Sequence, residues 1–110
     1  MSKKYLIKNG RVIDPANKTD EVLDIFISGG KIDKIGKKLD VKADEVINAE
    51  SRIVTPGLID MHVHLREPGR EDEETVKTGT RAALKGGFTG ILCMPNTDPA
   101  LDNPQAIKKL

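Results

Sequence analysis

Hydrophobic and polar residues alternate over short stretches in the first half of the chain, and turn residues separate these stretches. Two apolar runs flank Asn9-Gly10, a dipeptide that accepts positive φ at both turn positions, so a hairpin is predicted there. Gly29-Gly30 separates a second pair of alternating runs in the same way. A further extended run follows. Short, two-faced antiparallel strands predict a small sheet or half-sandwich over residues 1–54.

The pattern changes after Pro56. A compact apolar strand comes first, and residues 71–87 then show helical spacing, with acidic residues in the expected first turn and Gly86-Gly87 as the stop. A second, almost wholly apolar strand ends at Pro95. Strand, helix and apolar strand predict a βαβ unit, with a right-handed crossover and a parallel pair.

The end of the sequence predicts one more helix. Asp102 or Asn103 can cap it, and Pro104 suits its first position. The chain stops about two turns into this helix, and a lone βαβ unit cannot cover a parallel sheet on both faces. We therefore expect residues 55–110 to be the first part of a larger α/β domain whose remainder lies beyond Leu110 or in a partner.

Composition narrows the class of protein. Aromatic residues make up only 3% of the 110 residues, so Ile, Val, Leu and Ala must build the core. The 18 basic and 17 acidic residues nearly cancel, which gives no reason to expect nucleic acid or a membrane surface as a partner. Cys93 is the only cysteine, and no signal peptide or long apolar span is present. These features favour a soluble protein in the reducing cytoplasm.

The only two histidines in the chain, His62 and His64, stand one residue apart. Strict alternation along a strand puts them on one face together with Asp60. Two neutral imidazoles can bind one zinc or related divalent ion. The alternative is that each is an ordinary histidine with a local hydrogen bond. The position of the pair, at the C-terminal end of the first strand of a βα unit, favours the metal site.

Two histidines do not complete a zinc site, which needs three or four protein ligands. Cys93 is a nearby candidate, but its apolar surroundings favour packing as a small hydrophobic residue. Asp60 is expected to orient a ligand or to be a buried partner. The missing ligands are therefore expected outside this sequence.

The stretches PGLIDMHVHLREPG and ETVKTGTRAALKGGFTGILCMPNTDP resemble the opening of the cyclic amidohydrolases and, among them, the dihydroorotases. The resemblance covers Pro56 to about Asp102. It implies a metal-dependent (β/α)8 barrel, preceded by a small β-sandwich-type segment that these enzymes build from both chain ends. The paired histidines mark only the broad superfamily. In dihydroorotases the residues matching Arg66 and Asn96 bind the substrate's carboxylate, whereas hydantoinases and allantoinases carry other residues at one or both positions.

The chemistry of these two residues agrees with that role. Arg66 follows His64 on the loop leaving the first strand, and its planar guanidinium suits a bidentate carboxylate contact. Asn96 follows the neighbouring strand, where its amide can donate a second hydrogen bond. The alternatives are a surface arginine paired with Glu67 or Glu71, and an Asx-turn asparagine after Pro95.

The resemblance implies reversible cyclisation of N-carbamoyl-L-aspartate to dihydroorotate in pyrimidine synthesis. It implies one or two zinc ions, which His62 and His64 help to hold, and association with aspartate transcarbamoylase. The general acid/base, an aspartate in this family, has no matching position, so no catalytic residue is assigned in this segment. Residues 1–110 alone are expected to be inactive. The alternatives are a hydantoinase- or allantoinase-like enzyme and a non-catalytic, dihydroorotase-like scaffold.

Overall fold

A computed structural model describes residues 3–109 of the chain. It divides into two compact units, Met1–Pro56 and Gly57–Leu110. The boundary expected from the sequence lay two residues earlier, after residue 54. The first unit consists of strands, and the second combines strands with helices.

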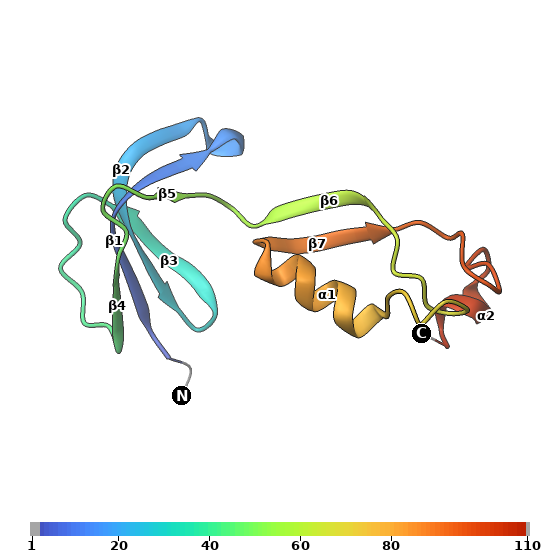
Figure 1. The fold of residues 1–110 in the computed structure, drawn as a ribbon. Coiled ribbons are helices and arrows are strands. Elements are labelled where there is room, and N and C mark those ends of the chain that lie inside the picture. Colours follow the sequence, from blue (N-terminus) through green and yellow to red (C-terminus); the bar gives the residue numbers. More distant parts are fainter. Residues whose placement is uncertain (1–2, 110) are drawn as a thin grey trace. The chain divides into compact units, whose positions relative to one another are not determined.

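The first unit is a five-stranded sheet (Figure 1). Four strands lie in the order β3-β2-β1-β4, and β5 also pairs with β1. Its core residues are few, and aliphatic side chains predominate among them, as the composition predicts. The elements are β1 (Tyr5–Asp14), the 3-10 helix η1 (Pro15–Asn17), β2 (Thr19–Ser28), β3 (Lys31–Gly36), β4 (Glu45–Asn48) and β5 (Ile53–Val54). The buried core side chains are Leu6, Val12, Ile25, Phe26 and Ala49.

The hairpin predicted at Asn9-Gly10 is wrong, because β1 runs straight through these residues. The register of β1 against β2 shifts between Ile7 and Gly10, which marks a β-bulge. Asn9 has a φ of 61°, and its backbone N donates to the buried carboxylate of Asp24 at 2.9 Å. The positive φ that favours a turn is thus used inside a strand to make a bulge.

The hairpin between β1 and β2 instead turns at η1. Asp14 caps this short helix, and Lys18 leaves it with a φ of 54°. Arg11 in β1 donates from Nε and Nη2 to both carboxylate oxygens of Asp20 in β2, at 2.7 and 2.8 Å. This contact lowers the pKa of Asp20 below its ordinary value.

The turn predicted at Gly29-Gly30 is confirmed. Ser28 pairs with Lys31 across it, and the two glycines have φ values of 63° and 74°, the positive range that a type I′ hairpin needs. The expectation of purely antiparallel strands is wrong at the other end of the sheet. Both β4 and β5 pair with β1 in parallel.

The second unit contains β6 (Leu58–Val63), α1 (Val76–Lys85), β7 (Phe88–Cys93) and α2 (Pro104–Ile107). β6 and β7 pair in parallel, and α1 packs against β7 (Figure 1), so the predicted βαβ unit is confirmed. α2 begins at Pro104, and the Asn103 side chain accepts from Ala106 N. No helix among residues 3–109 is long and apolar enough to cross a membrane.

The acidic residues predicted in the first turn of α1 lie before the helix. Thr75 is the N-cap, and it forms a reciprocal capping box with Thr78. A threonine with extended backbone and a hydroxyl that accepts from the third helical N–H is a favourable start, so the helix begins only at Val76. Lys85 in the last turn and the stop at Gly86 are confirmed.

Candidate metal and carboxylate site

The ladder between β6 and β7 is irregular just where the candidate site begins. Asp60 pairs with Ile91 and Val63 with Cys93, so three steps along β6 match two steps along β7. Partners in a regular ladder share a face, which puts Asp60 and Val63 on the same side. The prediction from strict alternation, that these two residues point to opposite faces, is wrong at this bulge.

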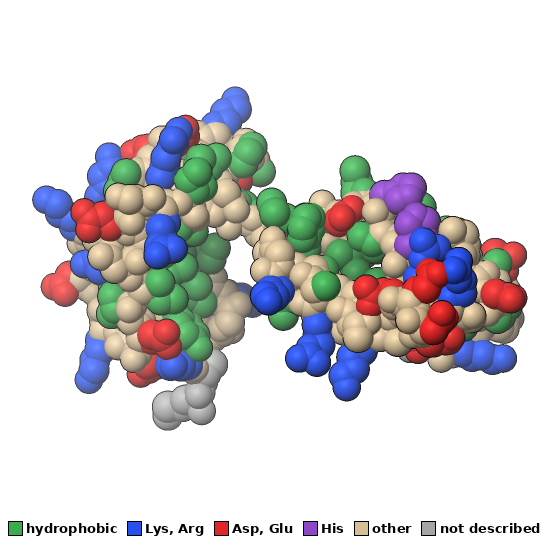
Figure 2. All heavy atoms as spheres, in the orientation of Figure 1, with side chains coloured by type: hydrophobic (Ala, Val, Ile, Leu, Met, Phe, Trp, Pro, Cys, Tyr) green, Lys and Arg blue, Asp and Glu red, His purple; other side chains and the backbone are tan. Residues whose placement is uncertain are grey.

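The two histidines lie close together at the end of β6. Their ring centroids are 5.2 Å apart, with the ring planes at 67°. Both residues are exposed, and in Figure 2 their purple side chains lie at the surface beside basic and acidic groups. The Asp60 carboxylate accepts from the backbone N of His62 at 3.0 Å. Asp60 therefore contacts the main chain of a candidate ligand.

Asn96 lies beside His64. The backbone N of Met94 donates to the carbonyl of Val63 at 2.8 Å, which keeps the segments that carry β6 and β7 side by side past the end of β7. Asn96 Oδ1 then lies 3.0 Å from His64 Nδ1. The expectation that these two strand ends meet is confirmed for this pair, and the Asn96 side-chain oxygen contacts the histidine ring.

Arg66 follows the histidines with a φ of 62° and is partly buried. Its Nε lies 3.4 Å from Oε2 of Glu73, a carboxylate that also forms an ion pair with Arg70. The ion-pair partner is therefore Glu73 and not Glu67 or Glu71, the two partners that the sequence suggested. The acidic run before α1 was the available signal, but which of its members turns inward depends on the loop path.

The loop that carries Arg66 is attached at two further points. The Glu67 carboxylate accepts from the backbone N of Val76, at the start of α1, at 2.7 Å. The carbonyl of Pro68 accepts from the backbone N of Asp98 at 3.0 Å. Gly69 has a φ of 108°, and a Cβ there would lie 2.3 Å from the carbonyl oxygen of Asp98. The loops after β6 and β7 therefore hold each other at the same edge of the sheet.

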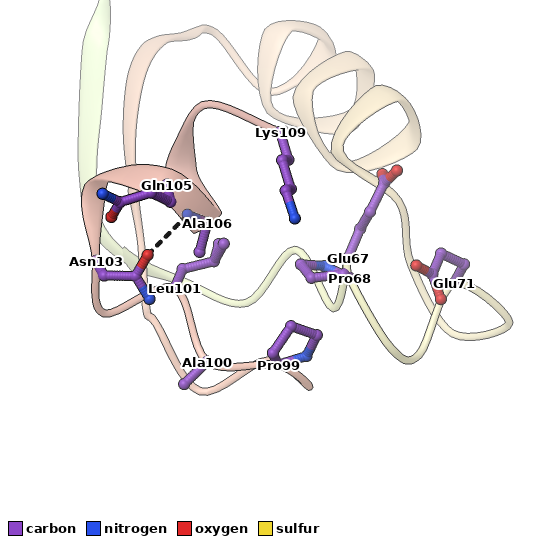
Figure 3. A pocket seen from close by; sticks show the side chains of 10 residues that line it. All are labelled: Glu67, Pro68, Glu71, Pro99, Ala100, Leu101, Asn103, Gln105, Ala106 and Lys109. Carbon is purple, nitrogen blue, oxygen red and sulfur yellow. Dashed lines mark hydrogen bonds between the residues drawn. The ribbon is translucent and has the colours of Figure 1, made fainter.

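A pocket of about 450 Å³ lies between these loops and α2 (Figure 3). The candidate site residues do not line this pocket; they are His62, His64, Arg66 and Asn96. A smaller hollow of about 230 Å³ between β6 and α1 includes His64 and Asp60 in its wall. The residues around the larger pocket are Glu67, Pro68, Glu71, Pro99, Ala100, Leu101, Asn103, Gln105, Ala106 and Lys109. The candidate metal-binding and carboxylate-binding side chains thus lie at the strand ends, outside the larger pocket.

The metal-ligand set within residues 3–109 is incomplete. No group of three or more His, Cys, Asp or Glu side chains in this part of the chain is arranged to hold an ion. Cys93 is partly buried at the end of β7. The exposed histidine pair is chemically suited to a divalent ion, and further ligands have to come from elsewhere.

Sequence relatives are similar over almost the whole chain. The family model described as dihydro-orotase-like matches residues 51–110. A dihydroorotase from Elusimicrobium minutum is 56% identical over 100 residues, which are 91% of this chain and 23% of that protein. A dihydroorotase from Geobacter sulfurreducens is 60% identical over 89% of this chain and 23% of its own length. The chain thus spans about a quarter of the length of these curated relatives.

Solved structures of related enzymes superpose on the chain. An L-hydantoinase from Arthrobacter aurescens matches with a TM-score of 0.84 and 27% identity, over 98% of this chain and 24% of that one. An N-acyl-D-glutamate deacylase from Bordetella bronchiseptica, solved with zinc and a phosphonate inhibitor, matches with a TM-score of 0.64 and 26% identity, over 83% and 18% of the two chains. The family model covers more than half of the residues, and the chain therefore belongs to the dihydroorotase-like family.

Proposed function

We propose that this chain supplies part of the active site of a dihydroorotase, the enzyme that interconverts dihydroorotate and N-carbamoyl-L-aspartate in pyrimidine biosynthesis. The observation that carries the proposal is the contact between His64 and Asn96, 3.0 Å apart. It joins a candidate metal ligand from one strand end to a candidate carboxylate-binding residue from the next. Arg66 leaves the same strand end two residues later.

The β6–α1–β7 segment is proposed to open a (β/α)8 barrel. Apolar side chains on both strands are exposed, with Ile59 71%, Met61 73% and Leu92 60% accessible. Parallel sheets occur almost only with both faces covered. The remaining strands and helices of a barrel would cover these side chains and would place the strand ends around one site.

His62 and His64 are proposed to hold zinc. Their adjacent, exposed rings fit a shared divalent ion, and the hydrogen bond at Nδ1 of His64 leaves Nε2 available. When bound, a divalent metal supplies Lewis-acid polarisation of the ring amide and activates water near neutral pH. The further ligands and the general acid/base would come from outside this chain, so one or two ions are compatible with it.

Arg66 and Asn96 are proposed to bind the carboxylate of dihydroorotate. The guanidinium supplies charge and paired donors, and the Asn96 amide nitrogen supplies another donor. Two anchors on one carboxylate fix the orientation of the ring and hold its amide toward the histidines. Asp60, which accepts from the backbone N of His62, is proposed to stabilise this end of β6.

A hydantoinase-like cyclic amidohydrolase is the second candidate, because the L-hydantoinase of Arthrobacter aurescens superposes on nearly the whole chain. Arg66 and Asn96 favour the dihydroorotase, since a cyclic amide without a carboxylate makes no use of a charged anchor. Their retention beside both histidines also favours an enzyme over a non-catalytic scaffold. Association with aspartate transcarbamoylase and a cytoplasmic location stay predictions of the family resemblance.

The proposal is tested with the purified full-length protein. We expect it to contain zinc by elemental analysis and to hydrolyse dihydroorotate. A chelator should abolish hydrolysis, and added zinc should restore it. A protein that carries no metal after expression in zinc-supplemented medium and does not turn over dihydroorotate would contradict the proposal.

A further inference from the structure

We propose that Asn96 is a positioning residue for His64, in addition to contacting substrate. The contact joins Asn96 Oδ1 to His64 Nδ1 at 3.0 Å. An amide oxygen can only accept a hydrogen bond, so His64 Nδ1 must carry the proton. In a neutral imidazole the lone pair then lies on Nε2. Asn96 thus selects the tautomer of His64 that presents Nε2 to a metal ion.

The backbone around Asn96 is held firmly enough for this role. The hydrogen bond from Met94 N to the carbonyl of Val63 joins the segment after β7 to the end of β6. It lies one residue before His64 and two residues before Asn96. The His64 ring also meets the ring of His62 edge to face. The hydrogen bond and this ring contact together restrict the rotation of His64.

The side-chain amide of Asn96 also has an NH2 group. With Oδ1 occupied by His64, the Asn96 NH2 group keeps two donors for the carboxylate assigned to it above, and this part of the inference rests on the proposed function. One amide then connects the carboxylate-binding site to the metal ligand. Because binding couplings are reciprocal, a carboxylate ligand that orders Asn96 should also raise the affinity for zinc.

Two substitutions of Asn96 distinguish the role of the amide oxygen from that of the NH2 group. Asn96→Asp keeps an oxygen acceptor for His64 Nδ1 but repels a carboxylate. Asn96→Ala removes both contacts. The matched control in the other unit is Asn17→Ala, which replaces an exposed asparagine of η1 whose side chain donates to Asp14, the N-cap of that helix.

The first measurement is the zinc affinity of the full-length variants, determined by competition with a chromogenic chelator without substrate. We expect Asn96→Ala to weaken zinc binding by about 10- to 100-fold, and Asn96→Asp and Asn17→Ala to stay within a few-fold of the unsubstituted protein. Both substitutions at Asn96 should raise KM for dihydroorotate. Unchanged zinc affinity in Asn96→Ala, or an equal loss in Asn96→Asp, would overturn the positioning role.

The second measurement needs no metal and no activity. In metal-free, full-length protein with 15N-labelled histidine, the His64 signals are assigned with a His64→Gln variant and recorded in mildly alkaline buffer. We expect the Nδ1–H tautomer, and its loss in Asn96→Ala. An Nε2–H tautomer in the unsubstituted protein would refute the inference. A protein with the expected tautomer that does not hydrolyse dihydroorotate would instead refute the proposed function alone.

Discussion

At the scale of single residues, Asp24 shows how a buried charge organises irregular backbone. It is 3% exposed, and its two oxygens accept from the backbone N of Asn9 and of Leu39, each at 2.9 Å. One of these donors lies in the β-bulge and the other follows β3. The carboxylate therefore satisfies two main-chain groups that the sheet itself leaves without a ladder partner.

Replacing Asp24 with Ala should lower the free energy of unfolding by about 2–4 kcal/mol, because two main-chain donors lose their acceptor. Asp33→Ala, on the exposed strand β3, should change it by less than about 0.5 kcal/mol. Urea denaturation of both variants measures the difference. Equal midpoints for the two variants would show that Asp24 does not hold the bulge.

The alternation of side chains along a strand predicted that His62 and His64 lie close together, and their rings are in contact. Alternation did not predict the extra residue in β6 between Asp60 and Val63. Bulges depend on pairing between segments distant in sequence. For the same reason the positive φ of Asn9 was correctly suspected but assigned to the wrong structure.

At the scale of elements, the βαβ order followed from the apolar pattern, but the start of α1 did not. Acidic residues are favourable near a helix N-terminus whether they lie just inside or just before it. Thr75 decides the start through its capping box, and the acidic run becomes loop. Because these residues lie in the loop before the helix, Glu73 reaches Arg66.

The two loops at the strand ends should be sensitive to a methyl group at Gly69, where a Cβ would lie 2.3 Å from the carbonyl oxygen of Asp98. Gly69→Ala should lower the free energy of unfolding by about 1–3 kcal/mol beyond the cost of its positive φ. It should also raise KM for dihydroorotate, because the added methyl group would displace the two loops on which Arg66 and Asn96 lie.

Gly87→Ala is the matched control, since Gly87 has a φ of 88° and open space where a Cβ would be. It carries the backbone strain without the clash. Thermal denaturation and steady-state kinetics of both variants provide the comparison. If Gly87→Ala raised KM as much as Gly69→Ala, loop contact would not explain the effect.

At the scale of the whole molecule, the chain spans about a quarter of its curated relatives, and its candidate site is correspondingly partial. The proposed site holds two histidines and the two residues proposed to bind a carboxylate, and no three-ligand metal cluster lies within residues 3–109. Sequence patterns could predict this edge of a site because the strand ends are local. The other walls of the proposed site would be formed by contacts that no pattern in these residues encodes.

Residues 1–110 expressed alone should therefore show no dihydroorotate hydrolysis, even with excess zinc. The physical reason is that at least one further metal ligand and a general acid/base are needed. The assay compares the isolated segment with the full-length protein at equal concentration. Turnover by the segment that persists after repurification would contradict the partial-site interpretation.

The sharpest measurement compares kcat/KM of the full-length protein for dihydroorotate and for dihydrouracil, which is the same ring without the carboxylate. We predict a strong preference for dihydroorotate. Arg66→Met should lower kcat/KM for dihydroorotate by roughly 10- to 100-fold and leave any activity on dihydrouracil nearly unchanged, because only the charged ligand loses a charge-assisted contact. Equal activity on both rings, or an equal loss on both in Arg66→Met, would contradict a carboxylate-binding site beside His62 and His64.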